Sequence, residues 1–267
     1  MSLCTWASDD SDSDCDEVRF DGQIPQPPVY RLLDAAVPDQ KVAYIPGFLA
    51  AKDISRIHRT AQREDVKVVN DRDDSLVYKH EVWRIEFALK EDCPEVYHRL
   101  MKTAWAGRSR AALDAELGWQ GIDEGKTVLF PEIEYIVYDV KQLKAPGSIQ
   151  RHRDNGSRVT AVVLLSDPRA FQGGVNCFDG EFDEPSRSLK LGFGDAVFFY
   201  GDRLLTHYRP TLFCPLYIPD DSSPRNLSGC YHWITDVVWG RRVVLQMELS
   251  QAEPCECTLL DFLGFCR

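Results

Sequence analysis

The heptapeptide Gln150-Arg151-His152-Arg153-Asp154-Asn155-Gly156 runs directly into the apolar segment Val159–Leu165. His152 and Asp154 are two residues apart, so on a β-strand both side chains point to the same face. A further histidine, His232, lies eighty residues later. Two imidazoles and one carboxylate on one face of a metal are the ligands of non-haem Fe(II) sites, which leave the opposite face open for a co-substrate and O2. This stretch therefore predicts an iron site at the end of a strand.

The distal ligand has two candidates, His207 and His232. His232 is followed by Gly240, which turns the chain, and by Arg242 at the start of the next strand. Two adjacent antiparallel strands bring these ends to one cavity, so we favour His232, with His207 as the alternative. His207 then belongs to an inserted loop, about residues 206–229, with four prolines. Loops of this length in a compact domain are usually functional or mobile, and we expect this one to cover the substrate.

Arg242 competes with Arg241 for the role of anion ligand. Alternate residues of the segment that follows form an apolar face, Val243, Leu245, Met247 and Leu249, and a more polar face, Val244, Gln246 and Glu248. Arg242 falls on the polar face, which suits a ligand-lined interior if helices cover the other face. A buried guanidinium is tolerated when it meets an anion, and its fork matches a carboxylate. We therefore predict that Arg242 binds the co-substrate and that Arg241 is structural.

Helical patterns precede Trp119 and strand patterns follow it. A short strand over Val42–Leu49 is followed by a helix capped by Asp53 or a neighbour, and further helices are predicted from about Pro94 and over Arg108–Leu117. The predicted strands, separated by Gly and Pro turns, are Ile133–Tyr138, Val159–Leu165, Gly174–Phe178, Ala196–Tyr200, Cys230–Val238 and Val243–Leu249. This order predicts an α+β fold built around a β-barrel or sandwich.

Composition limits the domain organisation. We predict a disordered acidic tail over residues 1–25 and a single domain over 26–267, because the run Ser8–Asp14 cannot bury apolar surface. The net charge of −11 argues against a nucleic-acid partner. No signal peptide or membrane span is visible, so we expect an intracellular protein, cytoplasmic or nuclear. We interpret Cys255, Cys257 and Cys266 as free thiols, since a structural zinc normally takes four ligands.

Taken in order, several segments resemble the Fe(II)/2-oxoglutarate-dependent dioxygenases, in particular their prolyl-4-hydroxylase-like branch. The matching segments span about residues 42–250: Val42–Leu49 with the helix at Asp53, Tyr138, Arg151–Asn155, Val159–Pro168, Gly173-Gly174, Gly194-Asp195-Ala196 and His232–Arg242. Three features depart from the family pattern. Four extra residues separate Tyr138 from His152, Asp236 replaces a usual proline, and the insert before His232 is long. Because the length of the loop before His152 differs, Tyr135 remains an alternative to Tyr138 for the co-substrate-binding tyrosine.

The resemblance implies a double-stranded β-helix (a jelly-roll or cupin-like core), with strands over about 130–250 and N-terminal helices packed on one sheet. It implies that His152, Asp154 and His232 bind Fe(II). 2-Oxoglutarate would chelate this metal and place its other carboxylate on Arg242 and Tyr138. O2 is the second co-substrate, and ascorbate is a candidate reductant. The carboxylate of Asp154 favours hydroxylation, because halogenating relatives carry a small residue there.

The substrate is the least determined part of the prediction. The resemblance suggests a prolyl or other protein side chain, and the alternative is a free amino acid or a small natural product. A catalytically silent barrel that only binds a partner is the third hypothesis, and the complete set of ligands argues against it. We expect neither a nucleic acid nor a membrane as a partner.

Overall fold

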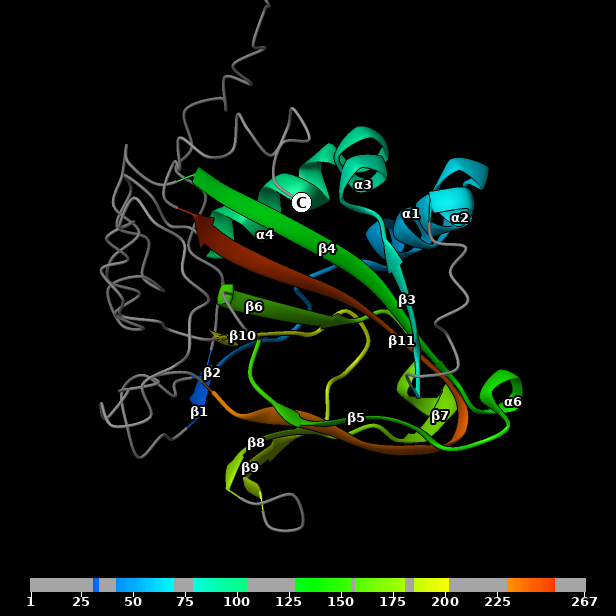
Figure 1. Ribbon diagram of the computed structural model, residues 1–267, viewed down its shortest axis with the longest axis vertical. Coiled ribbons are helices and arrows are strands. Elements are labelled where there is room, and N and C mark those ends of the chain that lie inside the picture. Colours follow the sequence, from blue (N-terminus) through cyan, green and yellow to red (C-terminus); the bar gives the residue numbers. More distant parts are fainter. Residues whose placement is uncertain are drawn as a thin grey trace, which may run out of the picture.

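The computed structural model describes residues 31–33, 42–69, 79–104, 128–154, 157–180, 185–201 and 230–252. The predicted acidic tail, the predicted helix Arg108–Leu117, the insert with His207 and the C-terminal cysteines lie outside the described residues. Within the described part, the chain forms two antiparallel β-sheets and a group of helices (Figure 1). No helix of this part is long and apolar enough to cross a membrane.

The larger sheet consists, in spatial order, of β1 (Arg31–Leu33), β2 (Val42–Ile45), β10 (Ala196–Tyr200), β6 (Ser157–Leu164), the second half of β11 (His232–Ala252), β4 (Val128–Asp139) and β3 (Glu81–Arg84). The smaller sheet consists of β5 (Gly147–His152), the first half of β11, β8 (Asn176–Gly180) and β9 (Pro185–Leu189), with β7 (Phe171–Gly173) also on β11. The two sheets therefore share one long strand, β11.

From β4 onward the chain passes between the two sheets in the order of a jelly roll. Strand β4, the second half of β11, β6 and β10 are neighbours in one sheet, and β5, the first half of β11, β8 and β9 are neighbours in the other. This order is that of a double-stranded β-helix, which confirms the predicted fold. Strand β11 changes sheets at Gly240, where φ is +79° and an added Cβ would lie 2.0 Å from the Ala170 carbonyl oxygen.

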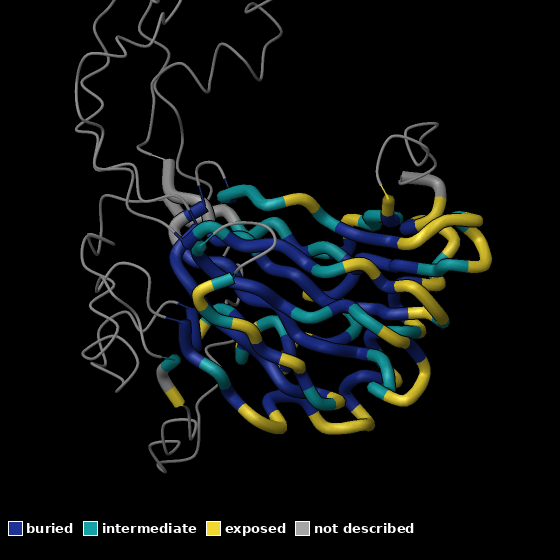
Figure 2. The backbone as a smooth tube through the Cα atoms, turned by 90° about the horizontal axis from the view of Figure 1, so that it is seen from below, coloured by how far each residue is buried: buried dark blue, intermediate teal, exposed yellow. Residues whose placement is uncertain are grey.

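The helices are α1 (Ala51–Ala61), α2 (Glu64–Val69), α3 (Glu86–Asp92), α4 (Pro94–Ala104) and the short α6 (Val140–Leu143), with a 3-10 turn at Pro168–Ala170. Helices α1, α3 and α4 cover the outer face of the larger sheet (Figure 1). Their apolar side chains pack on one face of the strands, including Ile133, Val137, Val243, Leu245 and Met247. Figure 2 shows the strands buried and the turns exposed. The predicted helical cover over this apolar face is confirmed.

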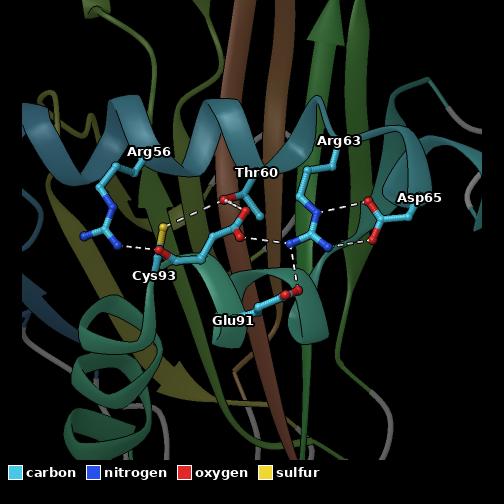
Figure 3. A network of polar contacts seen from close by, with 7 residues as sticks. Arg56, Thr60, Arg63, Asp65, Glu91 and Cys93 are labelled. Carbon is cyan, nitrogen blue, oxygen red and sulfur yellow. Dashed lines mark hydrogen bonds and ion pairs between the residues drawn. The ribbon is translucent and has the colours of Figure 1, made fainter.

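Helix α1 is fixed at both ends by polar contacts. Asp53 is the third residue of α1 rather than its N-cap, which is Ala50, and its carboxylate accepts the Ala50 N–H at 3.4 Å. Beyond the other end, Arg63 donates to Glu91 at 2.8 Å and to Asp92 at 2.9 Å (Figure 3). These half-exposed ion pairs add little stability but hold α1 against α3.

The entry segment is tied to the turn before β10 by Asp195. The carboxylate accepts hydrogen bonds from the Tyr44 hydroxyl at 2.6 Å, from the Gly47 N–H at 2.8 Å and from the Gly192 N–H at 2.7 Å. Burial and the hydrogen bond to Asp195 raise the pKa of Tyr44 to about 12. Two distant sequence segments thus meet at one carboxylate.

Candidate metal centre and co-substrate pocket

His152, Asp154 and His232 lie together at the junction of β5 and β11. His152 ends β5, and His232 begins β11 directly opposite it in the strand register. The possible ligand atoms of the three residues all lie within 4.8 Å of one another. Asp154 Oδ1 is 3.2 Å from His152 Nε2 and 3.4 Å from His232 Nε2. Among the described residues, this is the one group of three with the spacing of a metal site.

Backbone carbonyls orient both imidazoles. His152 Nδ1 lies 2.6 Å from the carbonyl oxygen of Gln150, and His232 Nδ1 lies 3.2 Å from that of Cys230. A carbonyl only accepts hydrogen bonds, so each Nδ1 carries a proton, and Nε2 is the nitrogen whose lone pair can bind a metal when the imidazole is neutral. This is the arrangement found behind metal-binding histidines.

The carboxylate of Asp154 is oriented by a hydrogen bond to Oδ2, the oxygen that does not face the imidazoles. Thr160 Oγ1 donates to Asp154 Oδ2, which leaves Oδ1 facing the two imidazoles. Burial opposes ionisation, but in the metal-free protein the charge of protonated His232 and the hydrogen bonds from protonated His152 and from Thr160 outweigh it and lower the pKa of Asp154 below its usual range. A bound metal would displace the two Nε2 protons and leave both imidazoles neutral. Two neutral nitrogen donors and one carboxylate oxygen thus converge on one point, a donor set that suits Fe(II).

Arg242 lies on the inner face of the larger sheet with a relative exposure of 1%. Its Nη2 donates to Asn176 Oδ1 at 3.3 Å, and its guanidinium carbon lies 5.2 Å from the centre of the Tyr138 ring. Nε and Nη1 are buried and have no hydrogen-bond partner. Burial lowers the pKa of Arg242 and raises that of Tyr138, and the contact between the guanidinium and the Tyr138 hydroxyl opposes both shifts. The guanidinium therefore offers two unpaired N–H donors to an anion.

Arg241 and Tyr135, the alternatives to Arg242 and Tyr138 that the sequence left open, do not line the same space. Arg241 is exposed, with its Nε 3.7 Å from Asp139 Oδ2. Tyr135 lies on the helix-covered face of β4, where its hydroxyl is 2.8 Å from His58 Nδ1. Arg242 and Tyr138 thus lie on the cavity face of their strands, and Arg241 and Tyr135 lie on the opposite face, as the alternation of the strands predicts.

A narrow cavity, open on one side, connects the two groups of residues. His152, His232, Arg242, Tyr138 and Asn176 all line it. Its apolar walls come from both sheets: Ile149, Val162, Phe178, Phe199, Ile234 and Val244. The Phe199 ring centre is 4.6 Å from that of His232. A metal held by the three ligands and a carboxylate on Arg242 would therefore share one apolar pocket.

Sequence reasoning missed three contributors to this site. Asn176 and Thr160 hold Arg242 and Asp154, and Gly174 allows the chain to pass close to Arg242. An added Cβ at Gly174, where φ is +65°, would lie 2.6 Å from Arg242 Cδ. The Gly173-Gly174 pair was a visible signal for a close approach, whereas nothing local distinguishes Asn176 or Thr160 from other strand residues.

No protein-family model matches the chain, and no curated protein matches it. Among solved structures, a Pseudomonas putida prolyl-4-hydroxylase is 16% identical, with 78% of this chain and 91% of that chain covered and a TM-score of 0.47. A viral collagen prolyl hydroxylase from Paramecium Bursaria Chlorella virus-1, in its 2OG complex, is 15% identical, with 79% and 96% covered and a TM-score of 0.47.

A Trichoplax adhaerens prolyl hydroxylase in complex with a hypoxia inducible factor peptide fragment is 12% identical. The match covers 78% of this chain and 83% of the Trichoplax chain, with a TM-score of 0.45. These proteins are similar to the chain at low identity. The double-stranded β-helix follows from the strand order of the chain itself, and this fold carries a His-x-Asp and a distal histidine on neighbouring strands.

Proposed function

We propose that the chain is an Fe(II)- and 2-oxoglutarate-dependent dioxygenase that hydroxylates an unactivated C–H bond. The observation that carries this proposal is that one cavity holds both a set of three metal ligands and a buried guanidinium without an anion. Three lone pairs converge at one of them, and two unpaired N–H groups of Arg242 are offered at the other. A buried guanidinium without an anion is costly, so its presence here favours a carboxylate ligand.

Each residue has a defined task in this proposal. His152, Asp154 and His232 would hold the metal, with both imidazoles fixed as Nδ1–H tautomers by backbone carbonyls. Arg242 would take the distal carboxylate of 2-oxoglutarate on its free edge, and the Tyr138 hydroxyl is the second candidate donor. When bound, the metal and 2-oxoglutarate supply the oxidising chemistry, with O2 consumed and succinate and CO2 released. The apolar walls exclude water from the reacting atoms.

For the substrate, a prolyl or other protein side chain is our first candidate, because of the resemblance in sequence to the prolyl-4-hydroxylase-like branch. A free amino acid or a small natural product is the second. A silent binding module is disfavoured, because the complete ligand set would have no purpose in it. A screen of peptides and metabolites for a mass gain of one oxygen decides between the first two.

The enzyme proposal is tested by anaerobic mixing of the purified protein with Fe(II) and 2-oxoglutarate. We expect a visible metal-to-ligand charge-transfer band, and succinate formation after admission of O2 with ascorbate as reductant. Absence of the band would refute the proposal. Iron retention by His232→Ala and His207→Ala tests the distal ligand: we expect loss in the first and retention in the second. The reverse result would transfer the role to His207.

A further inference from the structure

Three glutamates lie beside one another on the inner face of the larger sheet. Glu132 and Glu134 lie on β4, and Glu248 lies directly opposite Glu132 on the neighbouring strand β11 (Figure 1). Side chains directly opposite each other are about 4.5–5.5 Å apart, and like charges in such a pair destabilise a sheet. The alternation of the two strands puts all three glutamates on the face that carries Arg242 and Tyr138. We call these three glutamates the acidic wall.

The acidic wall borders both the cavity and the metal ligands. Gln246, which lines the cavity, donates to Glu248 Oε1 at 2.9 Å. Thr160, the residue of β6 directly opposite Glu248, donates to Asp154. The same cavity holds the buried Arg242, whose two unpaired N–H groups call for a ligand independently of the wall. A substrate carbon close to the metal would therefore lie close to these carboxyl groups.

The surroundings of the acidic wall supply few cations. Arg84 on β3 forms an ion pair with Glu132, and its Nε lies 3.9 Å from Glu134 Oε1. Within the described part of the chain, no cation forms an ion pair with Glu248, and burial together with the charge of Asp154 raises its pKa to about 8. Burial and the charge of Glu132 raise the pKa of Glu134 to about 7. A bound cation would favour the ionised form of both carboxyls.

The metal and the co-substrate would not supply the missing cation. The charges of Fe(II) and Arg242 balance those of Asp154 and the two carboxylates of 2-oxoglutarate, so the loaded centre is neutral overall. Arg84 can match one carboxylate of the wall. The other two would remain unmatched in a partly buried place, where like charges are costly. Carboxyl groups perturbed in this way beside a cleft are typical of functional sites.

We propose that the acidic wall binds a positively charged side chain of the substrate, that of lysine or arginine. The inference rests on the proposed function, because it names the substrate class of the same centre. An ammonium or guanidinium has several N–H donors and can bridge more than one carboxylate, which a prolyl ring cannot do. The methylene groups next to that charge are unactivated C–H bonds. Among protein side chains, the wall thus favours a basic side chain over proline.

The test uses short peptide pools whose central residue is lysine, arginine, norleucine or proline. Binding to full-length protein loaded with Fe(II) and 2-oxoglutarate is measured by equilibrium dialysis without O2, so the readout is affinity rather than turnover. We expect the lysine or the arginine pool to bind about tenfold or more tightly than the norleucine pool, which is similar in size but uncharged. Equal binding of charged and neutral pools, or no binding, would overturn the proposal.

Free lysine and free arginine are dialysed in the same way to identify the source of the cation. Tighter binding of the free amino acid than of its peptide pool would assign a free basic amino acid. The opposite order would assign a protein side chain. Equal binding of free lysine and free norleucine, with no charge preference among the pools, would overturn the proposal for both sources.

A double variant tests the wall itself. Glu134→Gln/Glu248→Gln keeps the side-chain sizes and should reduce the preference for lysine over norleucine about tenfold or more. The control Glu64→Gln/Glu91→Gln removes the same net charge from helix positions that are 85% and 69% exposed, and should change the preference less than about twofold. Equal losses in both double variants would overturn the proposal. The comparison of pools on the wild type decides the matter if the double variant does not fold.

The charge-transfer band of each protein is recorded before dialysis, so that two failures can be told apart. A band without a preference for charged pools would overturn the role of the acidic wall and leave the enzyme proposal standing. A preference for charged pools without the band would refute the enzyme proposal and support the wall as a cation-binding site.

Discussion

Replacing Arg242 with methionine should stabilise the ligand-free protein while abolishing its response to 2-oxoglutarate. Arg242 is almost fully buried, with two unpaired N–H groups and one hydrogen bond to Asn176. Each unsatisfied buried donor costs about 1–3 kcal/mol, so their removal gains roughly 2–6 kcal/mol. The lost hydrogen bond, which leaves the Asn176 oxygen unpaired, and the lost contact with the Tyr138 ring together offset about 2–4 kcal/mol. The net expectation is a gain of roughly 1 kcal/mol in the free energy of unfolding.

The sign of this change separates a ligand-binding arginine from a structural one. A buried side chain that serves packing alone would lose about 2–5 kcal/mol on substitution. Urea unfolding of the metal-loaded protein, with and without 2-oxoglutarate, provides the measurement. At one hundred times its dissociation constant, the ligand should stabilise the wild type by about 2.7 kcal/mol and Arg242→Met hardly at all.

The two proteins should therefore exchange their order of stability when 2-oxoglutarate is added. Arg241→Met is the matched control, because Arg241 is exposed and its ion pair is long. It should change stability by less than about 0.5 kcal/mol and keep the full response to the ligand. A loss of 2 kcal/mol or more in ligand-free Arg242→Met, or a retained response to the ligand, would refute the reasoning.

Three other substitutions test the surroundings of the site. Gly174→Ala places a Cβ 2.6 Å from the Cδ of the buried arginine and should weaken 2-oxoglutarate binding in a spectroscopic titration. Gly47→Ala is its control, since Gly47 has a similar φ of +60° but no neighbour within 4 Å, and equal effects on binding would contradict the steric argument. Thr160→Val removes the hydrogen bond to Asp154 and should lower iron affinity about 10- to 100-fold in a metal titration, with unchanged affinity as the opposing result. Burial, assisted by the charge of Asp154, raises the pKa of Glu248 to about 8, so the folded protein retains this proton and loses stability as pH rises from about 4.5 to 8. Glu248→Gln should therefore reduce the loss of unfolding free energy between pH 5 and pH 8 in metal-free protein, and an unchanged pH dependence would contradict this account.

The sequence predicted those parts of the fold that depend on local periodicity. Alternation along residues 242–249 separated a helix-covered face from a cavity face, and with it Arg242 from Arg241. The strand register then placed His232 opposite His152, as an antiparallel neighbour of the His-x-Asp strand. Both predictions used the two-residue period of a strand, which is a property of consecutive residues.

What the sequence did not predict depends on contacts between distant strands. Asn176 is 66 positions from Arg242 along the chain, and its role is visible only when β8 and β11 are neighbours. Asp195 joins Tyr44 across 151 positions in the same way. The two predicted strands over 230–249 proved to be one, because Gly240 turns the chain without interrupting its pairing. Tertiary neighbours of this kind leave no local pattern.

The continuity of β11 has a consequence for the choice of co-substrate. His232 and Arg242 belong to the same strand, and each half of that strand is pinned between two neighbours in its own sheet. The distance between the metal ligands and the guanidinium is therefore fixed by the pairing of β11 with its neighbours. We expect this fixed distance to discriminate among keto acids by chain length. A homologue of 2-oxoglutarate that is one carbon shorter or longer should reach either the metal or Arg242, but not both.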